Sequence, residues 1–233
     1  MFSWLNKDKQ ELKNPDFKKI KLLAKGGFSK IYLGLNKNRD YVIIKCIKDN
    51  KYKKFVNSLL EVDIHKSLNH ELIVMYYKDF IIYNKHYIIL EYCGTTLENV
   101  KINKSNKLIY LASICKGLMY IHSQHIIHRD ISLDNIYINN YNNIKIGDFG
   151  LSVKFKDICD CTDNVLCTKL SQSGKVNYVS PEIITNKITY NQIYKIDVWA
   201  LGVLMFKWIT DRFPFDSKFI NQIFVHLIII LIP

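Results

Sequence analysis

The chain has 233 residues, of which 48% are hydrophobic and 23% charged, and it carries a formal net charge of +12. This hydrophobic fraction is enough to bury a sizeable core, and the length predicts one large domain or two small lobes. The positive charge is spread along the chain without the interleaved aromatic residues of nucleic-acid-binding segments, so we expect no specific nucleic acid as a partner.

The beginning of the chain carries no sign of export. Met1–Gln10 lacks the hydrophobic stretch of a secretion signal, and the six cysteines are scattered along the sequence. We assign residues 1–16 to an amino-terminal extension. We expect a cytoplasmic protein that does not enter a membrane, because a reducing cytosol is the default for such a chain.

Two further regions have clear periodic patterns. Residues 17–35, FKKIKLLAKGGFSKIYLGL, predict two strands joined by a glycine-bearing turn. Residues 108–125 predict a helix, because apolar residues recur at helical spacings. We expect one apolar stripe on this helix, formed by Leu108, Leu111, Ala112, Cys115, Leu118 and Met119.

The segment after this helix combines two short strands with two polar motifs. The strands, Ile136–Ile138 and Ile144–Ile146, are predicted on either side of an asparagine-rich turn. His128-Arg129-Asp130 precedes them, with Asn135 five positions after the aspartate, and Asp148-Phe149-Gly150 follows them. Side chains on loops at the ends of ordered elements are well placed for function.

These side chains suit phosphoryl transfer from ATP. The reaction needs a carboxylate that positions the attacking hydroxyl, and oxygen ligands that hold Mg²⁺ on the phosphates. Asp130 can do the first, and Asn135 and Asp148 can do the second. We therefore take Asp130 and Asn135 as candidate catalytic residues, and Asn135 and Asp148 as candidate magnesium ligands.

The two motifs and the hairpin between them resemble the catalytic core of the eukaryotic protein kinase family. Further matches follow in the family's order, at Ser180-Pro181-Glu182 and at Asp197–Gly202. Residues 174–182, GKVNYVSPE, are similar to the serine/threonine type. The resemblance covers residues 17–215. It implies ATP-dependent transfer of a γ-phosphoryl group to a serine or threonine hydroxyl of a protein substrate, with Mg²⁺ as cofactor.

The resemblance also implies an α+β, bilobal fold. Its small lobe would be an antiparallel β-sheet with one main helix, and its second lobe would be mostly helical. We place the ATP-binding lobe at residues 17–92, and a partial second lobe with the catalytic and activation segments, lacking the family's last helices, at 93–222. Residues 223–233 form an apolar tail of doubtful origin, either a segment that contacts a partner or a membrane, or the product of a truncated gene.

The resemblance assigns ATP binding to the first lobe. Ala24, Gly26 and Ser29 occupy the three glycine positions of the loop that covers the phosphates, and Ile31 would cover the adenine. Only Gly26 keeps the glycine, whose missing side chain permits close backbone approach to a phosphate.

Two further groups of residues complete the implied ATP site. Lys45 would bind the α- and β-phosphates and pair with Glu61 on the following helix. Asp63 would point elsewhere, because helical residues two apart do not share a face. Taken alone, Lys45 could be a strand-edge lysine that reaches water. Leu90 would be the gatekeeper residue, and the backbones of Glu91 and Cys93 would hydrogen-bond to adenine.

Three residues depart from the family pattern. Ile43 replaces the alanine that packs on adenine, Ser132 replaces the lysine two residues after the catalytic aspartate, and Lys175 replaces a threonine. We hypothesise that Lys175 supplies the cation that Ser132 cannot, since a charge near the transferring group is a large catalytic effect. Alternatively, Ser132 is a simple loss and Lys175 a surface residue. The departures leave a second interpretation open, a weak or inactive pseudokinase that acts as a binding module.

The sequence also suggests how activity could be regulated. Arg129, next to the catalytic aspartate, suggests control by phosphorylation of the activation segment through an arginine–phosphate contact. Ser171 is the favoured phosphosite by its distance from Gly174, with Thr168 and Ser173 as alternatives. The sequence does not indicate an oligomeric state.

Overall fold

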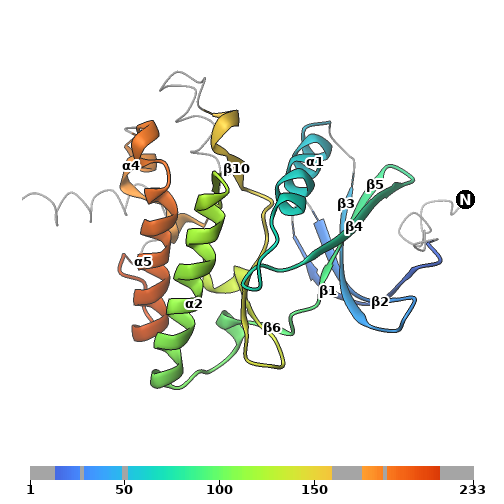
Figure 1. Ribbon diagram of the computed structural model, residues 1–233, viewed down its shortest axis with the longest axis horizontal. Helices are drawn as coiled ribbons and strands as arrows, with labels where there is room; N and C mark the ends of the chain where they lie inside the picture. The colour runs from blue at the N-terminus through green and yellow to red at the C-terminus, as the bar shows by residue number, and fades with distance from the viewer. Residues whose placement is uncertain (1–13, 27–28, 49–51, 159–174, 186–187, 216–233) are drawn as a thin grey trace, which may run out of the picture. The chain divides into compact units, whose positions relative to one another are not determined.

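The computed structural model describes residues 14–26, 29–48, 52–158, 175–185 and 188–215 (Figure 1). Contacts divide the chain into two units, which we describe separately. The first unit consists of the described residues up to Val62 together with Met75–Tyr92. The second includes Asp63–Val74 and continues from Cys93. The sequence placed Asp63–Val74 within the first lobe, but Ile64, Leu68 and Ile73 of this segment belong to the buried core of the second unit.

The first unit contains a five-stranded antiparallel sheet with the strand order β1-β2-β3-β5-β4. The strands predicted within residues 17–35 are β1 and β2, which pair as a hairpin. The bounds are Phe17–Lys25 for β1, Ser29–Asn36 for β2, Tyr41–Lys48 for β3, Tyr76–Ile82 for β4 and Lys85–Glu91 for β5.

The two faces of this sheet have different roles. One face carries an apolar core formed by Val42, Ile44, Cys46, Tyr87 and Ile89. The alternate residues of β3 and β5 point to the opposite face, since side chains alternate along a strand. Helix α1, Tyr52–Ser67, contacts that second face through its first-unit residues.

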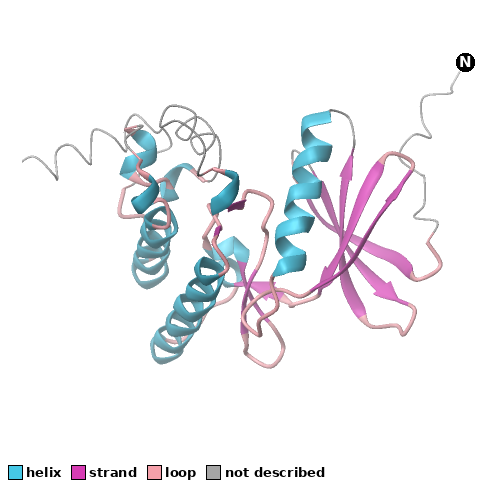
Figure 2. Ribbon diagram, turned by 45° about the horizontal axis from the view of Figure 1, so that its top comes forward, coloured by secondary structure: helices cyan, strands magenta, loops and turns pink. Residues whose placement is uncertain are grey.

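The second unit is mostly helical, with short strands between the helices (Figure 2). Among its described residues, the helices after the end of α1 are α2, Lys104–Ser123; α4, Pro181–Ile184; and α5, Lys195–Thr210. One small sheet contains β6, Thr95–Thr96; β8, Ile136–Ile138; and β9, Ile144–Ile146. A separate two-stranded sheet contains β7, Ile126–Ile127, and β10, Val153–Lys154. Single 3-10 turns occur at Leu97–Asn99, Leu133–Asn135, Phe155–Asp157, Val176–Tyr178 and Tyr190–Gln192.

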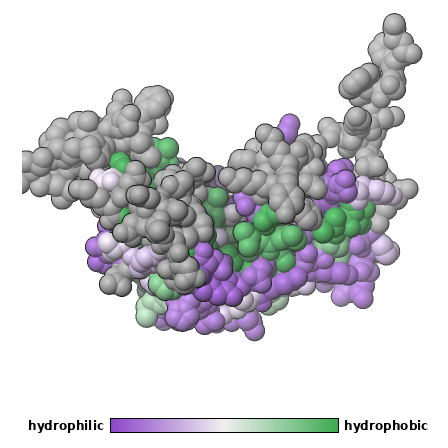
Figure 3. Space-filling model, turned by 90° about the horizontal axis from the view of Figure 1, so that it is seen from above, coloured by the Kyte–Doolittle hydropathy of each residue, from purple (hydrophilic) through white to green (hydrophobic). Residues whose placement is uncertain are grey.

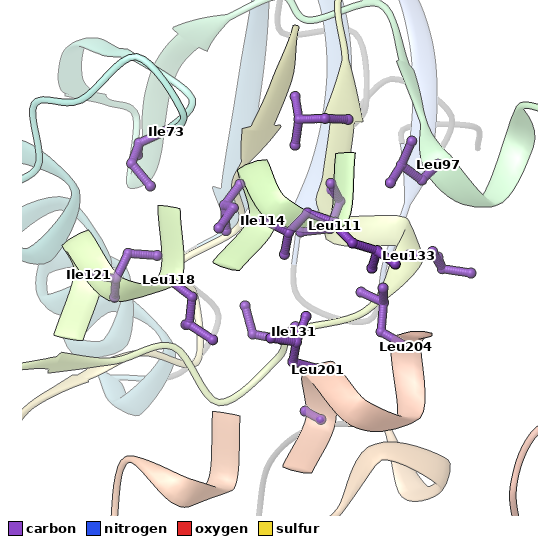
Figure 4. Close-up of a cluster of buried hydrophobic side chains, with 14 of the residues drawn as sticks. Ile73, Leu97, Leu111, Ile114, Leu118, Ile121, Ile131, Leu133, Leu201 and Leu204 are labelled. Atoms are coloured by element: carbon purple, nitrogen blue, oxygen red, sulfur yellow. The ribbon is translucent and has the colours of Figure 1, made fainter. Parts of the chain in front are cut away.

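The core of the second unit lies between its two long helices and the segment that carries Asp130 and Asn135. Ile114 and Leu118 of α2, and Leu204 of α5, belong to the same buried cluster as Ile131 and Leu133 (Figure 4). Ile131 and Leu133 alternate in sequence with the polar residues Asp130, Ser132 and Asp134. Packing of these two side chains therefore helps to fix the loop on which the candidate catalytic residues lie.

The predicted stripe on α2 was partly wrong. Leu108 and Met119 are 67% and 71% exposed, and Ala112 is exposed as well. Among the described residues of α2, the buried hydrophobic side chains are those of Tyr110, Leu111, Ile114, Leu118 and Ile121. Apolar residues occur all around this helix, so its periodicity does not select one face. The helix also begins earlier than predicted, where the Asn103 side chain accepts a hydrogen bond from the Asn106 N–H at 3.0 Å.

The expected fold class is confirmed, with an antiparallel sheet and one main helix in the first unit and a mostly helical second unit. Figure 3 shows one side of the described surface, on which hydrophobic residues gather in patches beside hydrophilic ones. Among the described residues, no helix combines the length and the apolar character needed to cross a bilayer. The predicted apolar tail, residues 223–233, lies outside the described residues.

Candidate active site

A buried carboxylate anchors the loop that carries His128-Arg129-Asp130. Asp197, in the first turn of α5, is 0% exposed. Its Oδ2 accepts a hydrogen bond from the His128 N–H at 2.8 Å, and its Oδ1 accepts one from the Arg129 N–H at 2.7 Å. His122 Nε2 lies 2.8 Å from the same Oδ2. Because the carboxylate binds backbone groups, it fixes the path of the loop itself.

Arg129 occupies a strained backbone position within this loop. Its φ is 67°, in the left-handed region that residues other than glycine rarely adopt. The guanidinium Nη1 donates a hydrogen bond to the Leu151 carbonyl at 3.1 Å. Burial lowers the pKa of Arg129 to about 10, against the opposing effect of Asp197. The side chain therefore remains a cation at neutral pH.

Asp130 and Asn135 form the centre of the candidate site. The Asn135 amide Nδ2 donates to the Asp130 carbonyl at 2.8 Å and to the Asp130 carboxylate Oδ2 at 2.7 Å. Asn135 is buried and lies at the end of a 3-10 turn, just before β8. Since its amide nitrogen makes both bonds, its amide oxygen is the atom that it could offer to a cation.

The second motif begins where β9 ends. The Gly147 N–H donates to the Asn135 carbonyl at 3.0 Å, and His128 Nε2 lies 3.2 Å from the Gly147 carbonyl. Asp148 follows with a φ of 63° and an exposed side chain. The hydrogen bonds of Gly147 thus connect the two motifs, and Asp148 presents a carboxylate at the surface of the second unit.

Phe149 fixes this second motif from inside. Its side chain is fully buried, and its ring centroid lies 5.0 Å from that of His128 and 4.8 Å from that of His65. Packing of Phe149 in the core, next to an exposed Asp148, sets the direction of the carboxylate.

In the first unit, Lys45 and Glu61 form a buried ion pair. Lys45 Nζ on β3 lies 2.6 Å from Glu61 Oε1 on α1, and the two side chains are 11% and 5% exposed. Asp63, two positions farther along α1, belongs to the second unit and pairs with Lys154 instead. The hydrogen bond from Lys154 lowers the pKa of Asp63. The structure thus gives Lys45 the partner that the sequence proposed.

The glycine-bearing turn lies between β1 and β2. The Gly26 N–H donates to the Ser29 carbonyl at 2.9 Å, which closes the described part of the turn. Ala24 pairs with Ile31 across the hairpin. Ala24 and Gly26 are exposed, while Ser29 and Ile31 are partly buried. This places all four residues at the tip of the hairpin or beside it, in the first unit.

The predicted adenine-binding residues lie at the end of β5. Leu90 is buried and pairs with Ile43 of β3. The Glu91 N–H donates to the Met75 carbonyl, and the Glu91 carboxylate Oε2 accepts from the Met75 N–H, both at 2.9 Å. Cys93 is buried and is the first residue of the second unit after β5.

The structure brings Lys175 to Ser132, as the coupled departures suggested. Lys175 Nζ donates to Ser132 Oγ at 2.8 Å and also binds the Asp134 carboxylate. Ser132 is 1% exposed and lies two residues after Asp130. A cavity of about 250 Å³ opens beside Lys175, lined by Glu98, Asp134, Lys175, Val176, Asn177, Tyr178 and Phe213.

Some predicted residues are not placed. Ser171, Thr168 and Ser173 lie outside the described residues. Glu182, the last residue of the Ser180-Pro181-Glu182 motif, has a buried Oε2 with no hydrogen-bond partner in the described part of the chain.

Sequence reasoning missed two structural supports of the site. Asp197 was recognised within a helix motif, but the sequence did not indicate that it binds the backbone of His128 and Arg129. Ser58 and His86, which connect α1 with the sheet, belong to no motif that could have drawn attention to them.

Comparison with known proteins agrees with the geometry of the site. The protein kinase domain family matches residues 17–231 of the chain. The chain is 31% identical over 213 residues to the serine/threonine-protein kinase polo of Drosophila melanogaster, covering 87% of this chain and 35% of the relative. It is 33% identical over 213 residues to the serine/threonine-protein kinase PLK2 of Mus musculus, covering 87% and 30%.

A yeast relative gives the same result. The cell cycle serine/threonine-protein kinase CDC5/MSD2 of Saccharomyces cerevisiae is 29% identical over 220 residues, covering 90% of this chain and 30% of the relative. The chain thus spans about a third of the length of these curated relatives.

Proposed function

This chain belongs to the protein kinase family, and from that premise we propose that it is an ATP-dependent serine/threonine protein kinase. It would transfer the γ-phosphoryl group of ATP to a serine or threonine hydroxyl of a protein. The observation that carries this proposal is the pairing of Asp130 with Asn135 on a loop whose backbone is bound to buried Asp197. The serine/threonine kinases among its relatives support the choice of substrate class.

Asp130 is the candidate base. Its Oδ2 accepts a hydrogen bond from Asn135, and this bond holds the carboxylate in one orientation. A carboxylate held in this way can position the attacking hydroxyl and accept its proton, which is the limited covalent chemistry that phosphoryl transfer requires.

The donor set of the second unit fits Mg²⁺. The metal prefers oxygen ligands, and Asn135 offers an amide oxygen while Asp148 offers an exposed carboxylate. When bound, the metal would neutralise charge on the phosphates of ATP. Lys45, held by Glu61 in the first unit, would bind the α- and β-phosphates, and the tip of the β1–β2 hairpin around Gly26 would cover them.

We assign the remaining predicted residues of the ATP site to the adenine. Ile31 and Leu90 would contact the base, and the backbones of Glu91 and Cys93 would hydrogen-bond to it. The two hydrogen bonds between Glu91 and Met75 support this role, because they hold the end of β5 in a defined position.

Lys175 would supply the positive charge that this chain lacks at Ser132. Its ammonium group binds Ser132 and Asp134, and Asp134 directly precedes Asn135. A preorganised cation close to the transferring group stabilises negative charge that develops in the transition state. Lys175 would therefore be a third catalytic residue, beside Asp130 and Asn135.

Regulation would act through Arg129. Its buried guanidinium stays charged and lies on the catalytic loop, so a phosphate on the activation segment could bind it. Ser171 is the favoured phosphosite, with Thr168 and Ser173 as alternatives. A full-length preparation treated with a phosphatase should lose activity if this regulation operates.

The proposed function is tested by phosphoryl transfer to a generic basic protein in the presence of ATP and Mg²⁺. The wild-type chain should label serine or threonine, and the Asp148→Asn variant should lose transfer by about three orders of magnitude, because the carboxylate ligand is lost. A thermal-shift titration with ATP, with and without Mg²⁺, accompanies the assay. ATP-dependent stabilisation without any transfer would indicate the pseudokinase alternative.

A further inference from the structure

A buried polar network connects α1 with the edge of the first unit's sheet. Ser58 Oγ lies 2.8 Å from His86 Nδ1, and His86 Nε2 lies 2.9 Å from Asp79 Oδ2. The Tyr76 hydroxyl donates to the other carboxylate oxygen of Asp79. Ser58 is 2% exposed and His86 is 0% exposed. We call Ser58, His86 and Asp79 the α1 network.

The chemistry of these groups determines which atom donates and which accepts in each hydrogen bond of the network. A carboxylate only accepts hydrogen bonds, so His86 Nε2 carries a hydrogen that it donates to Asp79. In a neutral imidazole, Nδ1 is then an acceptor, and the Ser58 hydroxyl donates to it. Each bond in the network thus determines the next one, and the loss of one member leaves a buried polar atom without that partner.

The residue types match those of a nucleophilic triad, but the placement does not. Ser58 is nearly fully buried within α1, so no substrate could reach its hydroxyl. A structural role therefore accounts for the network better than a hydrolytic one.

The α1 network and the Lys45–Glu61 pair lie on the same face of the sheet. Lys45 pairs with Ile88 across β3 and β5, and Ile47 pairs with His86. Since alternate residues of a strand share a face, Lys45 and His86 are diagonal neighbours beneath α1. Their partners on the helix, Ser58 and Glu61, are three residues apart and therefore also share a face.

We propose that the α1 network is a positioning device for the Lys45–Glu61 ion pair. Without the α1 network, the Lys45–Glu61 pair would be the one remaining hydrogen-bonded attachment described here between the first-unit part of α1 and the sheet, and this part of the helix could shift more easily on the sheet. A second attachment, one helical turn away, restricts this movement, so that the Glu61 carboxylate stays 2.6 Å from Lys45 Nζ. Ser58, His86 and Asp79 are thus positioning residues that act through Glu61. This inference rests on the proposed function only for its kinetic readout.

The kinetic test is a double-mutant cycle with Ser58→Ala and Glu61→Gln. In the wild-type background, Ser58→Ala should lower kcat/KM for ATP by about tenfold, because His86 loses a buried hydrogen bond. In the Glu61→Gln background, the same substitution should change kcat/KM by less than about twofold, because the pair that it positions is already broken. An equal loss in both backgrounds would overturn the proposal.

Matched variants separate positioning from general loss of stability. Ile89→Ala removes a buried side chain from the opposite face of the same sheet, so it should lower Tm while leaving kcat/KM for ATP within about twofold. His86→Asn keeps an amide near the position of Nδ1 as a partner for Ser58. It should retain more activity than His86→Val, which removes both bonds, and equal activity of the two variants would contradict the proposal.

A spectroscopic readout makes the test independent of catalysis. A buried, paired lysine ammonium exchanges its protons slowly, so Lys45 should give a ¹H–¹⁵N ammonium signal, assigned by its loss in Lys45→Met. Ser58→Ala should reduce this signal as Glu61→Gln does, whereas Ile89→Ala should preserve it. If the wild-type chain transfers no phosphate but the signal follows this pattern, the proposed function fails and the positioning role holds. An unchanged signal in Ser58→Ala overturns the positioning role.

Discussion

The proposed catalytic loop of the second unit and the Lys45–Glu61 pair of the first unit are held in place by different means. The loop is bound through its own backbone, because two of its N–H groups donate to the buried Asp197 carboxylate. The ion pair is held by side chains, with Lys45 on a strand, Glu61 on a helix and the α1 network beside them. The first arrangement tolerates side-chain variation within the loop, whereas the second depends on the packing of separate elements.

This difference predicts which substitutions should impair each unit most. In the second unit, one residue outside the loop should matter more than most residues within it. In the first unit, the sensitivity should be shared among several residues that lie far apart in the sequence. The following substitutions test this contrast, beginning with the largest expected effect.

Asp197→Asn should have the largest effect on the catalytic loop. The new amide would direct a donor at one of the two loop N–H groups, so a buried donor loses its acceptor. We expect a loss of about 3 kcal/mol in the free energy of unfolding, measured by urea denaturation, together with loss of transfer. Asp211→Asn, at the other end of the same helix with a φ of 58°, is the matched control and should change stability by less than about 0.5 kcal/mol, because asparagine tolerates this conformation. Similar losses in both variants would contradict the anchoring role.

Lys175→Ala tests whether phosphoryl transfer also depends on a second-unit side chain that lies far from the Asp130 loop in the sequence. We expect kcat to fall by about 10²-fold with little change in KM for ATP, because a transition-state charge is removed. Lys175→Arg should retain part of the rate. Lys116→Ala, an exposed lysine of α2, should have no effect. An unchanged kcat in Lys175→Ala would mean that Lys175 is an ordinary surface residue.

Gly147→Ala tests the close packing that connects the two motifs. A Cβ at this position would lie 2.7 Å from Val74 Cγ2 and 3.0 Å from Tyr137 Cε2. We expect a loss of about 1–3 kcal/mol in the free energy of unfolding, measured by thermal or urea denaturation, because neighbouring side chains must move. Gly202→Ala is the control, since nothing lies within 4 Å of its Cβ position. Equal stability of the two variants would count against tight packing at Gly147.

The smallest effect is expected at the exposed ion pair of α1. Asp63 and Lys154 have side chains that are 67% and 18% exposed, in contrast to the buried pair formed by Glu61. Lys154→Ala should cost less than about 1 kcal/mol. Because Lys154 lowers the pKa of Asp63 below its ordinary value of 3.8, the contribution of the pair is present above about pH 4 and is lost as the pH falls through the lowered pKa. A wild-type advantage over Lys154→Ala that stays constant as the pH is lowered from neutral into the acid range, in urea denaturation, would contradict this assignment.

The sequence predicted the fold best where short-range patterns determine structure. Strands β8 and β9 occur at the predicted residues, because alternation and an asparagine-rich turn are local signals. The buried face of α2 was predicted poorly, since Leu108 and Met119 are as apolar as the residues that are buried. Only the packing of α2 in the second unit's core decides which face is covered.

The candidate site likewise contains some residues that sequence patterns indicate and others that only the packing of separate elements reveals. Asp130, Asn135 and Asp148 could be proposed as site residues from the sequence, because their motifs have a defined spacing along the chain. The meeting of Lys175 and Ser132 could also be predicted, but only because two departures from one family pattern occurred together. Ser58, His86 and Asp79 could not, because their hydrogen bonds depend on the register of β4 and β5 and on the position of α1 above them.

The most direct test of phosphoryl transfer at Asp130 is single-turnover transfer by the wild-type chain and its Asp130→Asn variant, with ATP binding measured for both. We expect Asp130→Asn to bind ATP with nearly the wild-type affinity and to transfer the phosphoryl group about 10³-fold more slowly, because the positioned base is lost while the binding residues remain. Transfer by Asp130→Asn at the wild-type rate, or ATP binding by the wild-type chain without transfer, would contradict this expectation.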